Sequence, residues 1–421
     1  MQFPQLAFAE SPAKFCASGA SATAPRGGPP GPKIILYSHD TFGLGNIRRT
    51  LLLAEALREE FPSAAILILT GSPVIQSFRI PEGVDYIKLP CLDRVDADRY
   101  EPRYLGACAA EVKATRRALL INAVLGFVPD LMIVDKRPTG VDGELAATLE
   151  LLRARHPSTK LVLGIRDILD APEQTRLSLE RSGAFASMER YYDEVWIYGA
   201  QELFDPIVEY GFPQAVADRT EFCGYLRRPT KPAASRSGPP RVLVTTGGSG
   251  DGGDVVQAYL EGLVDLPRRL TLRSTIVFGP HLIEGRRSAI LDRYGELSDV
   301  EFIDFEPDLT NRYANADVVV SMAGYNAVCE ILSFGVPAVL VPRAQPVQEQ
   351  LIRSRLLASR GLCDYVEPHE LEPGVLMEKV LRLLHGETAL SAETIDLGGL
   401  PRVLDRCRSL LAMRAARGSV A

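Results

Sequence analysis

A glutamate follows a small-residue turn in the C-terminal third of the chain. Ala323 and Gly324 interrupt a β-branched run, and Glu330 lies six positions after the glycine, within the helix that is predicted to follow. A tight turn that leads into a helix presents free backbone N–H groups and the positive end of the helix dipole, which suit a phosphate. A carboxylate there can accept hydrogen bonds from the two hydroxyls of a ribose. The alternative is a structural strand–helix–strand unit with a surface glutamate.

A glycine-rich run forms a second candidate phosphate loop. Gly247, Gly248, Ser249 and Gly250 belong to a stretch, 247–253, in which six of the seven residues lack a bulky side chain, and which follows a predicted strand at 241–246. Such a backbone either approaches another group closely or adopts positive φ. Ahead of a helix it suits a diphosphate, and the absence of a following Lys-Ser/Thr excludes a P-loop.

The first strand of the chain, predicted at 33–38, is also followed by a polar, glycine-containing loop. The loop contains the side chains of His39, Asp40 and Asn46 and the glycines Gly43 and Gly45, and a helix is predicted at 47–60. Strand, glycine loop and helix are typical of a ligand-binding first crossover. A third glycine is missing, which disfavours NAD. Asp40 or His39 could deprotonate an acceptor hydroxyl.

Charged and amide residues follow other predicted strands. Arg166 and Asp167 come after a strand at 161–165, and Gln348, Glu349 and Gln350 come after one at 337–341. The carboxyl ends of parallel strands face the crevice in which α/β proteins bind ligands. Arg166 and Asp167 are interpreted either as a structural ion pair or as contacts to an acceptor.

The segment 317–350 resembles the donor-binding signature of the MurG-like glycosyltransferases of family 28. The residues that match this signature are Ser321, Ala323, Gly324, Glu330, Gly335, Pro337, Pro342 and Gln350. The glycine-rich run resembles the GGS-x-G loop of that family, and residues 305–309 resemble its F-x-x-D-M/L segment. Glu349 departs from the glutamine that relatives often have.

The first loop resembles H-D-x-x-G-x-G-H-x-R-R, found in a MurG-related group of predicted glycosyltransferases. The matching residues are His39, Asp40, Gly43, Gly45, Arg48 and Arg49, whereas Asn46 stands where relatives commonly have histidine. Certain nucleotide-sugar hydrolases of the same architecture share a similar G-x-G-H-x-x-R loop.

The resemblance implies a role for each of these residues. Glu330 would hold the ribose, residues 348–350 would reach the sugar, and the backbone of Glu306 would recognise the base. The diphosphate would lie on the amides of Gly247, Gly248, Ser249, Gly250, Ala323 and Gly324. Asp40 or His39 would act as the base, and the acceptor side would include Gly43, Gly45, Asn46, Arg166 and Asp167.

Alternating strands and helices in both halves predict an α/β protein of GT-B architecture, with two Rossmann-like domains that face a cleft. We expect a disordered N-terminal extension at 1–32, an acceptor domain at 33–229, a Pro/Ser-rich linker at 230–240 and a donor domain at 241–399. The family implies that a last helix, within 400–421, packs back on the first domain. No signal peptide is expected.

Composition limits the possible environments and partners. The 421 residues have a net charge of −6, which argues against a nucleic-acid-binding surface. Seven scattered cysteines favour a reducing compartment without disulfides or a zinc site. We expect a cytoplasmic protein, with the inner face of the membrane as one possible place of work. A long helix, predicted at 103–127, has Lys113, Arg116 and Arg117 either on a solvated face or in a patch that docks on anionic lipid.

The sequence therefore predicts a transferase that moves a hexose-type sugar from a nucleoside diphosphate donor, expected to be UDP-linked. The family implies inversion, and neither a metal ion nor another cofactor is expected. The acceptor, lipid-linked or a small molecule, is left open. A nucleotide-sugar hydrolase and a non-catalytic nucleotide-sugar-binding protein are the alternatives; the loss of the histidine at position 46 counts against the first and supports the second.

Overall fold

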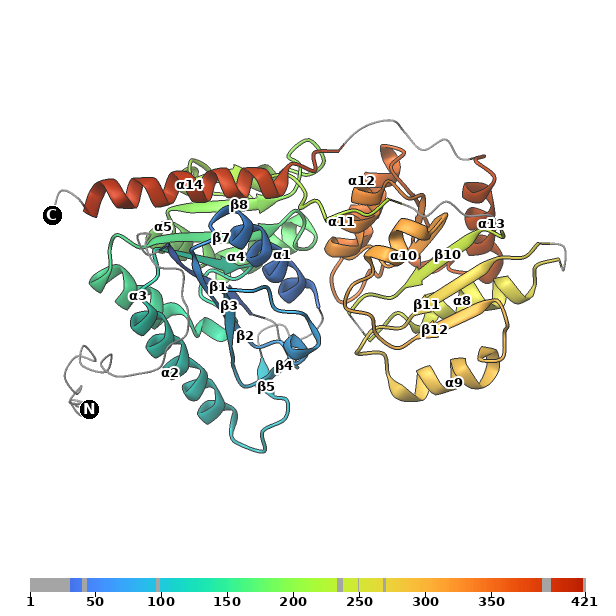
Figure 1. Cartoon of the computed structure of the whole chain (residues 1–421), viewed down its shortest axis with the longest axis horizontal. Helices are drawn as coiled ribbons and strands as arrows, with labels where there is room; N and C mark the ends of the chain where they lie inside the picture. Colours follow the sequence, from blue (N-terminus) through green and yellow to red (C-terminus); the bar gives the residue numbers. More distant parts are fainter. Residues whose placement is uncertain are drawn as a thin grey trace. The chain divides into compact units, whose positions relative to one another are not determined.

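The computed structural model describes residues 31–39, 44–95, 99–232, 238–248, 250–267, 270–387 and 395–418. The predicted N-terminal extension lies almost entirely outside these ranges, as do residues 233–237 of the predicted linker. Within the described ranges the chain forms two parallel sheets and one two-stranded ribbon, shown in Figure 1.

The first sheet takes all its strands from the N-terminal half, in the order β3-β2-β1-β6-β7-β8-β9, and every neighbouring pair is parallel. These strands are β1 (Lys33–Ser38), β2 (Ala65–Thr70), β3 (Val84–Lys88), β6 (Leu131–Asp135), β7 (Lys160–Arg166), β8 (Glu194–Tyr198) and β9 (Thr220–Phe222). The helices of this half are α1 (Gly45–Glu60), α2 (Ala109–Phe127), α3 (Ala146–Arg155), α4 (Pro172–Arg181), α5 (Ala184–Tyr191), α6 (Pro206–Glu209) and α7 (Gln214–Ala217).

The second sheet repeats this arrangement, with the parallel order β12-β11-β10-β13-β14-β15. Its strands are β10 (Arg241–Thr245), β11 (Arg273–Val277), β12 (Val300–Ile303), β13 (Val318–Ser321), β14 (Ala338–Leu340) and β15 (Asp364–Tyr365). Its helices are α8 (Gly253–Val264), α9 (Glu284–Tyr294), α10 (Thr310–Asn315), α11 (Tyr325–Phe334), α12 (Glu349–Ser359) and α13 (Pro373–Leu384).

Both sheets have the doubly wound order in which the first strand lies beside the fourth. The order in which strands are added therefore reverses between β1 and β6 in the first sheet and between β10 and β13 in the second. In such sheets, ligands bind beyond the carboxyl ends of the strands at this reversal. The loops after β1, β10 and β13 are thus the ones that the fold places at candidate binding positions.

The last helix, α14 (Gly399–Gly418), belongs to the C-terminal half by sequence but packs on the first half, where it contacts α1, β6 and β7. Figure 1 shows it, in red, lying along the first sheet. Val403, Cys407 and Leu410 on this helix are buried in the same hydrophobic cluster as residues of α1. Among the described residues, no helix combines the length and the apolar content needed to cross a bilayer.

The predicted helix at 103–127 begins later than expected, at Ala109. Residues Tyr100–Pro102 form β5, which pairs in antiparallel fashion with β4 (Leu92–Arg94), and this ribbon was not predicted. Pro102, the last residue of the ribbon, and Gly106 both precede the helix, and neither residue favours a helix interior.

The predicted basic face of this helix is wrong at Arg116. Its side chain is fully buried, and two of its nitrogens donate to the carboxylate of Glu144 at 2.6 Å. Arg116 shares a stripe of buried residues with Val112, Leu120 and Val124, all at intervals of four residues, so its position on the helix faces the protein interior. Of the other two cations, Lys113 pairs with Asp142 at 2.8 Å and Arg117 is exposed.

Candidate functional site

A cavity of about 940 Å³ lies at the carboxyl ends of both sheets, at their reversal points. Twelve of the predicted site residues line it: His39, Gly45, Asn46, Arg166, Gly247, Gly248, Gly250, Glu306, Gly324, Glu330, Glu349 and Gln350. Three others, Ala323, Gln348 and Asp167, are described but do not line it. Asp40, Gly43 and Ser249 lie outside the described residues.

The turn between β13 and α11 directs the start of a ten-residue helix at the cavity. Gly324 is the residue before the helix, with φ −66° and ψ 144°, and its N-terminal backbone has no side-chain cap. The helix ends at Gly335, whose φ of 60° suits glycine. The uncapped N–H groups at the start of α11 therefore remain available to an anion in the cavity.

Glu330, in the second turn of α11, is 6% exposed and forms an ion pair with Arg48 of α1. Its other carboxylate oxygen has no hydrogen-bond partner. Two further contacts join the same two helices. Asn326 donates to the backbone oxygen of Gly45 at 2.9 Å, and Arg228 donates to both Asn326 and the backbone oxygen of Arg48. The carboxylate predicted to hold a ribose is therefore held by an arginine of the other half.

The glycine-rich run passes close to the loop after β1. A β-carbon on Gly248 would lie 2.6 Å from the backbone nitrogen of Leu44, so only glycine fits there. Gly247 has φ 74°, which also favours glycine. The prediction of positive φ or of a close backbone approach is thus confirmed at these two positions. The group that the backbone of Gly248 approaches is Leu44 of the protein itself.

Phe305 and Glu306 form the part of the cavity wall that is predicted to recognise the nucleotide base. The ring of Phe305 is half-buried and packs edge-to-face with Phe78 of the first half, with centroids 6.1 Å apart. The Glu306 side chain accepts from Arg312 at 3.1 Å. The backbone N–H and C=O of Glu306 are therefore the groups that could recognise the edge of a nucleotide base.

The loop that precedes α12 is attached to the first half. The backbone N–H of Gln348 donates to Asp170 at 2.7 Å, and buried Glu349 forms an ion pair with Arg166. Burial alone would raise the pKa of Glu349, but Arg166 and the other nearby cations hold it below its usual range. The side chain of Gln350 accepts from the backbone of Arg343.

Asn46 links two buried residues at the start of α1. Its amide nitrogen lies 3.2 Å and 3.4 Å from the two ring nitrogens of His39, and its oxygen accepts from Arg49 at 3.0 Å. Arg49 also donates to both oxygens of Asp135, at 2.7 Å each. Burial, followed by the charges of Lys136 and neighbouring arginines, lowers the pKa of His39 well below its usual value. The ring is therefore neutral at pH 7 and able to accept a proton.

Lys136, directly after β6, lines the cavity with a titratable amine and was not predicted as a site residue. It adopts a left-handed backbone with φ 68°, rare for a residue with a side chain, and its N–H donates to Gly164 at 2.7 Å. Burial and then the charge of Arg166 lower the pKa of its amine to about 7. Its position directly after a strand, where the strand order reverses, is the signal from which a role at the site could have been predicted.

Arg166 and Asp167 do not form the ion pair that was one of the two interpretations. Successive residues of a strand point to opposite faces, so Arg166 meets Glu349 while Asp167 points into the protein. Arg353 of α12 donates to Asp167 at 2.7 Å and 2.8 Å, and the Tyr225 hydroxyl donates to it at 2.6 Å. Burial would raise the pKa of Asp167, but Arg353 holds it below its usual range.

Comparisons with known proteins identify a family domain in the C-terminal half. Residues 242–398 match the glycosyltransferase family 28 C-terminal domain. Over 157 residues the chain is 31% identical to the UDP-N-acetylglucosamine–N-acetylmuramyl-(pentapeptide) pyrophosphoryl-undecaprenol N-acetylglucosamine transferase of Mannheimia succiniciproducens, which covers 37% of this chain and 43% of that one. The chain spans 39–50% of the length of the first curated relatives it matches.

Longer matches extend over both halves at lower identity. The transferase of the same name from Paenarthrobacter aurescens is 27% identical over 82% of this chain and 87% of its own length. The crystal structure of MurG from Acinetobacter baumannii superposes with a TM-score of 0.55 and 16% identity, covering 90% of this chain and 99% of that one, which shows a shared fold. Residues 242–398 therefore have the C-terminal domain of the family 28 glycosyltransferases, and the whole chain is similar to MurG-like transferases in sequence and shares their GT-B architecture.

Proposed function

We propose that this protein transfers a hexose-type sugar from a UDP-linked donor to an acceptor. The observation that carries the proposal is a single cavity lined by the glycine-rich run, by the start of α11 with Glu330, and by His39 and Asn46 of the first loop. Relatives whose names include a UDP-N-acetylglucosamine donor support the choice of nucleotide.

In this proposal the second half binds the donor. The N–H groups at the start of α11 and in the glycine-rich run bind the diphosphate, Glu330 accepts from the ribose hydroxyls, and the backbone of Glu306 meets the base. Gln350 and Glu349 lie beyond β14, where they reach the sugar. Backbone amides and helix N-termini can stabilise the departing diphosphate, so the proposal includes no divalent ion.

The transfer step is a single displacement with inversion. An acceptor hydroxyl attacks the anomeric carbon, the bond from that carbon to the UDP oxygen breaks, and the acceptor proton passes to a base. His39 is our choice for the base because it is buried in the cavity wall and neutral at pH 7. Asp40, the alternative, lies outside the described residues.

We propose a lipid-linked acceptor, presented at the cytoplasmic face of a membrane. The relatives' names specify a pyrophosphoryl-undecaprenol acceptor. Lys136 and Arg166 line the first half of the cavity and could attract the phosphates of such a compound. A small-molecule acceptor with an anionic group would meet the same cations.

Thermal shift assays with nucleoside diphosphates and their sugars test the donor site. UDP should raise the melting temperature of the wild type and of Glu296→Ala, an exposed glutamate in the same half, but not of Glu330→Ala. A shift with GDP or dTDP instead of UDP would contradict the nucleotide assignment.

Release of UDP from a UDP-sugar distinguishes the reactions. Release that depends on an added acceptor supports transfer, whereas equal release into water alone would indicate a hydrolase. Tight UDP binding without turnover under either condition would indicate a binding protein.

A further inference from the structure

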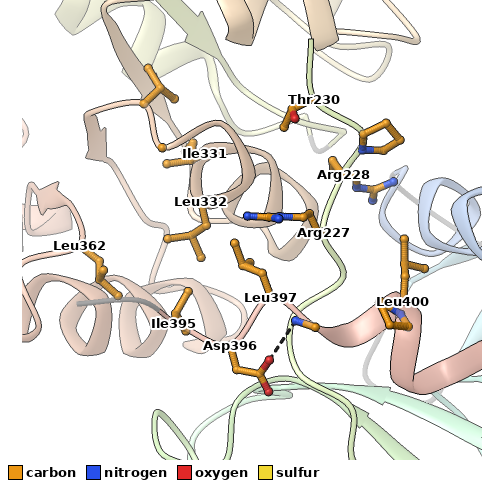
Figure 2. A pocket seen from close by; sticks show the side chains of 15 residues that line it. Arg227, Arg228, Thr230, Ile331, Leu332, Leu362, Ile395, Asp396, Leu397 and Leu400 are labelled. Carbon is orange, nitrogen blue, oxygen red and sulfur yellow. Dashed lines mark hydrogen bonds between the residues drawn. The ribbon is translucent and has the colours of Figure 1, made fainter. Parts of the chain in front are cut away.

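A second cavity, of about 930 Å³, lies where the chain crosses between its two halves. We call it the crossover cavity. Its apolar wall includes Leu332, Val336, Leu362, Ile395, Leu397 and Leu400, and Figure 2 shows several of these side chains around the open space. It lies on the face of α11 opposite to the one that bears Asn326 and Glu330, so it is separate from the proposed donor site.

Two crossing segments form one side of this cavity and are hydrogen-bonded to each other. The backbone N–H of Tyr225 donates to Asp396 at 2.8 Å, and that of Gly399 donates to Tyr225 at 3.1 Å. Leu226 pairs in antiparallel fashion with Gly398. The backbone of Arg228 also donates to Ser333 of α11 at 2.9 Å. The walls are therefore connected by backbone contacts, and the cavity is a built feature of the fold.

The charge at this cavity is not balanced. Asp396 already accepts from the backbone of Gly398 at 2.9 Å and from Arg402 at 2.5 Å. Arg227, which is exposed, makes no hydrogen bond and no ion pair within the described part of the chain. In Figure 2 its side chain extends toward Leu332, above Leu397, whereas Arg228 points away from the cavity. A guanidinium without a carboxylate partner thus lies at the mouth of an apolar cavity.

We propose that the crossover cavity binds an amphipathic anion, with its apolar chain along α11 and its carboxylate on Arg227. The volume lies in the range of small-molecule sites, whereas a stable protein partner would need a much larger surface. An apolar chain matches the leucine and isoleucine wall, and a carboxylate matches the geometry of a guanidinium. This inference is independent of the proposed sugar transfer.

Isothermal titration calorimetry with the full chain and dodecanoate, below its micelle concentration and without any nucleotide, tests the site. We expect one molecule of dodecanoate to bind, and dodecanol, which has the same chain without the charge, to bind at least tenfold more weakly. Arg227→Glu should weaken dodecanoate at least tenfold. Arg181→Glu, the same change at an exposed arginine of α4, should alter it less than twofold.

A wall variant provides the second arm of the test. Leu332→Gln, with its folding checked by melting temperature, should weaken dodecanoate and dodecanol alike, because both rely on the apolar wall. No dodecanoate binding to the wild type would overturn the proposal. So would equal binding of dodecanoate by the wild type and Arg227→Glu, or equal binding of dodecanoate and dodecanol.

Discussion

Arg48 and Glu330, 282 residues apart in the sequence, form an ion pair across the proposed donor site. The arginine comes from the first turn of α1 and the glutamate from the second turn of α11. Arg48 therefore occupies one of the two oxygens of the carboxylate that we assign to the ribose. A donor nucleotide must displace this arginine before both oxygens of Glu330 can accept from its hydroxyls.

Arg48→Met should therefore bind UDP about tenfold more tightly than the wild type. The variant leaves a buried carboxylate without its partner, at a cost of about 1–3 kcal/mol, and a ribose would recover much of this. The free variant should accordingly melt at a lower temperature. Titration calorimetry measures the affinity, and weaker binding would show that Arg48 serves the ligand directly.

Lys136→Met should stabilise the folded protein most at pH values below 7. There the wild-type amine is charged in both the folded and unfolded states, and burial beside Arg166 makes the charged amine unfavourable in the folded state. Above its lowered pKa of about 7 the folded state releases this proton, so wild-type stability rises toward pH 10 and the advantage of the variant shrinks. Each kcal/mol corresponds to roughly 2–4 °C in melting temperature.

Melting curves of both proteins at pH 6 and pH 9 check this prediction. A difference that is the same at both pH values would mean that the Lys136 amine is not perturbed.

Arg353→Met should destabilise the protein by about 3–5 kcal/mol, because it leaves Asp167 buried without its partner. Arg355→Met is the matched control. It removes an arginine two positions along the same helix that is 54% exposed in its pair with Glu367, so its effect should stay below about 1 kcal/mol. Urea denaturation measures both, and equal effects would contradict the structural role of the buried pair.

If His39 is the base, kcat at saturating acceptor should be nearly constant from pH 7 to 9 and fall only in acid, well below pH 6.5. The lowered pKa of His39 keeps the ring unprotonated over the neutral range, and activity is lost when it becomes charged. His39→Gln should lower kcat at least a hundredfold with little change in UDP affinity. Wild-type rates in both His39→Gln and Asp40→Asn would refute both assignments.

Much of the local structure follows from the sequence because its signals are local. β1 has the predicted bounds, and β7, β10 and β14 differ from theirs by one residue at one or both ends, since each is a short, mostly β-branched or apolar run. α11 follows Gly324 as predicted. Even the burial of Arg116 could have been found, because it shares a four-residue stripe with three apolar residues.

The electrostatic connections of the site had no such signal. The partner of Asp167 is 186 residues away and that of Glu330 is 282 residues away, and neither arginine differs from a surface arginine in its local sequence. Arg166 and Asp167 were considered as a pair because they are adjacent, yet alternation along a strand separates them. Such partners depend on how two sheets are placed, which hydrophobic periodicity does not encode.

The position of α14 affects how this protein can be divided for experiments. Its buried face completes the packing of α1, and its arginines pair with Glu60, Glu194 and Asp130 of the first half. An N-terminal fragment that ends near residue 229 would therefore expose an apolar groove and three carboxylates that have lost their arginine partners. Chimaeras that exchange donor specificity between relatives should keep this terminal helix with the half it covers, rather than with the half that precedes it in the sequence.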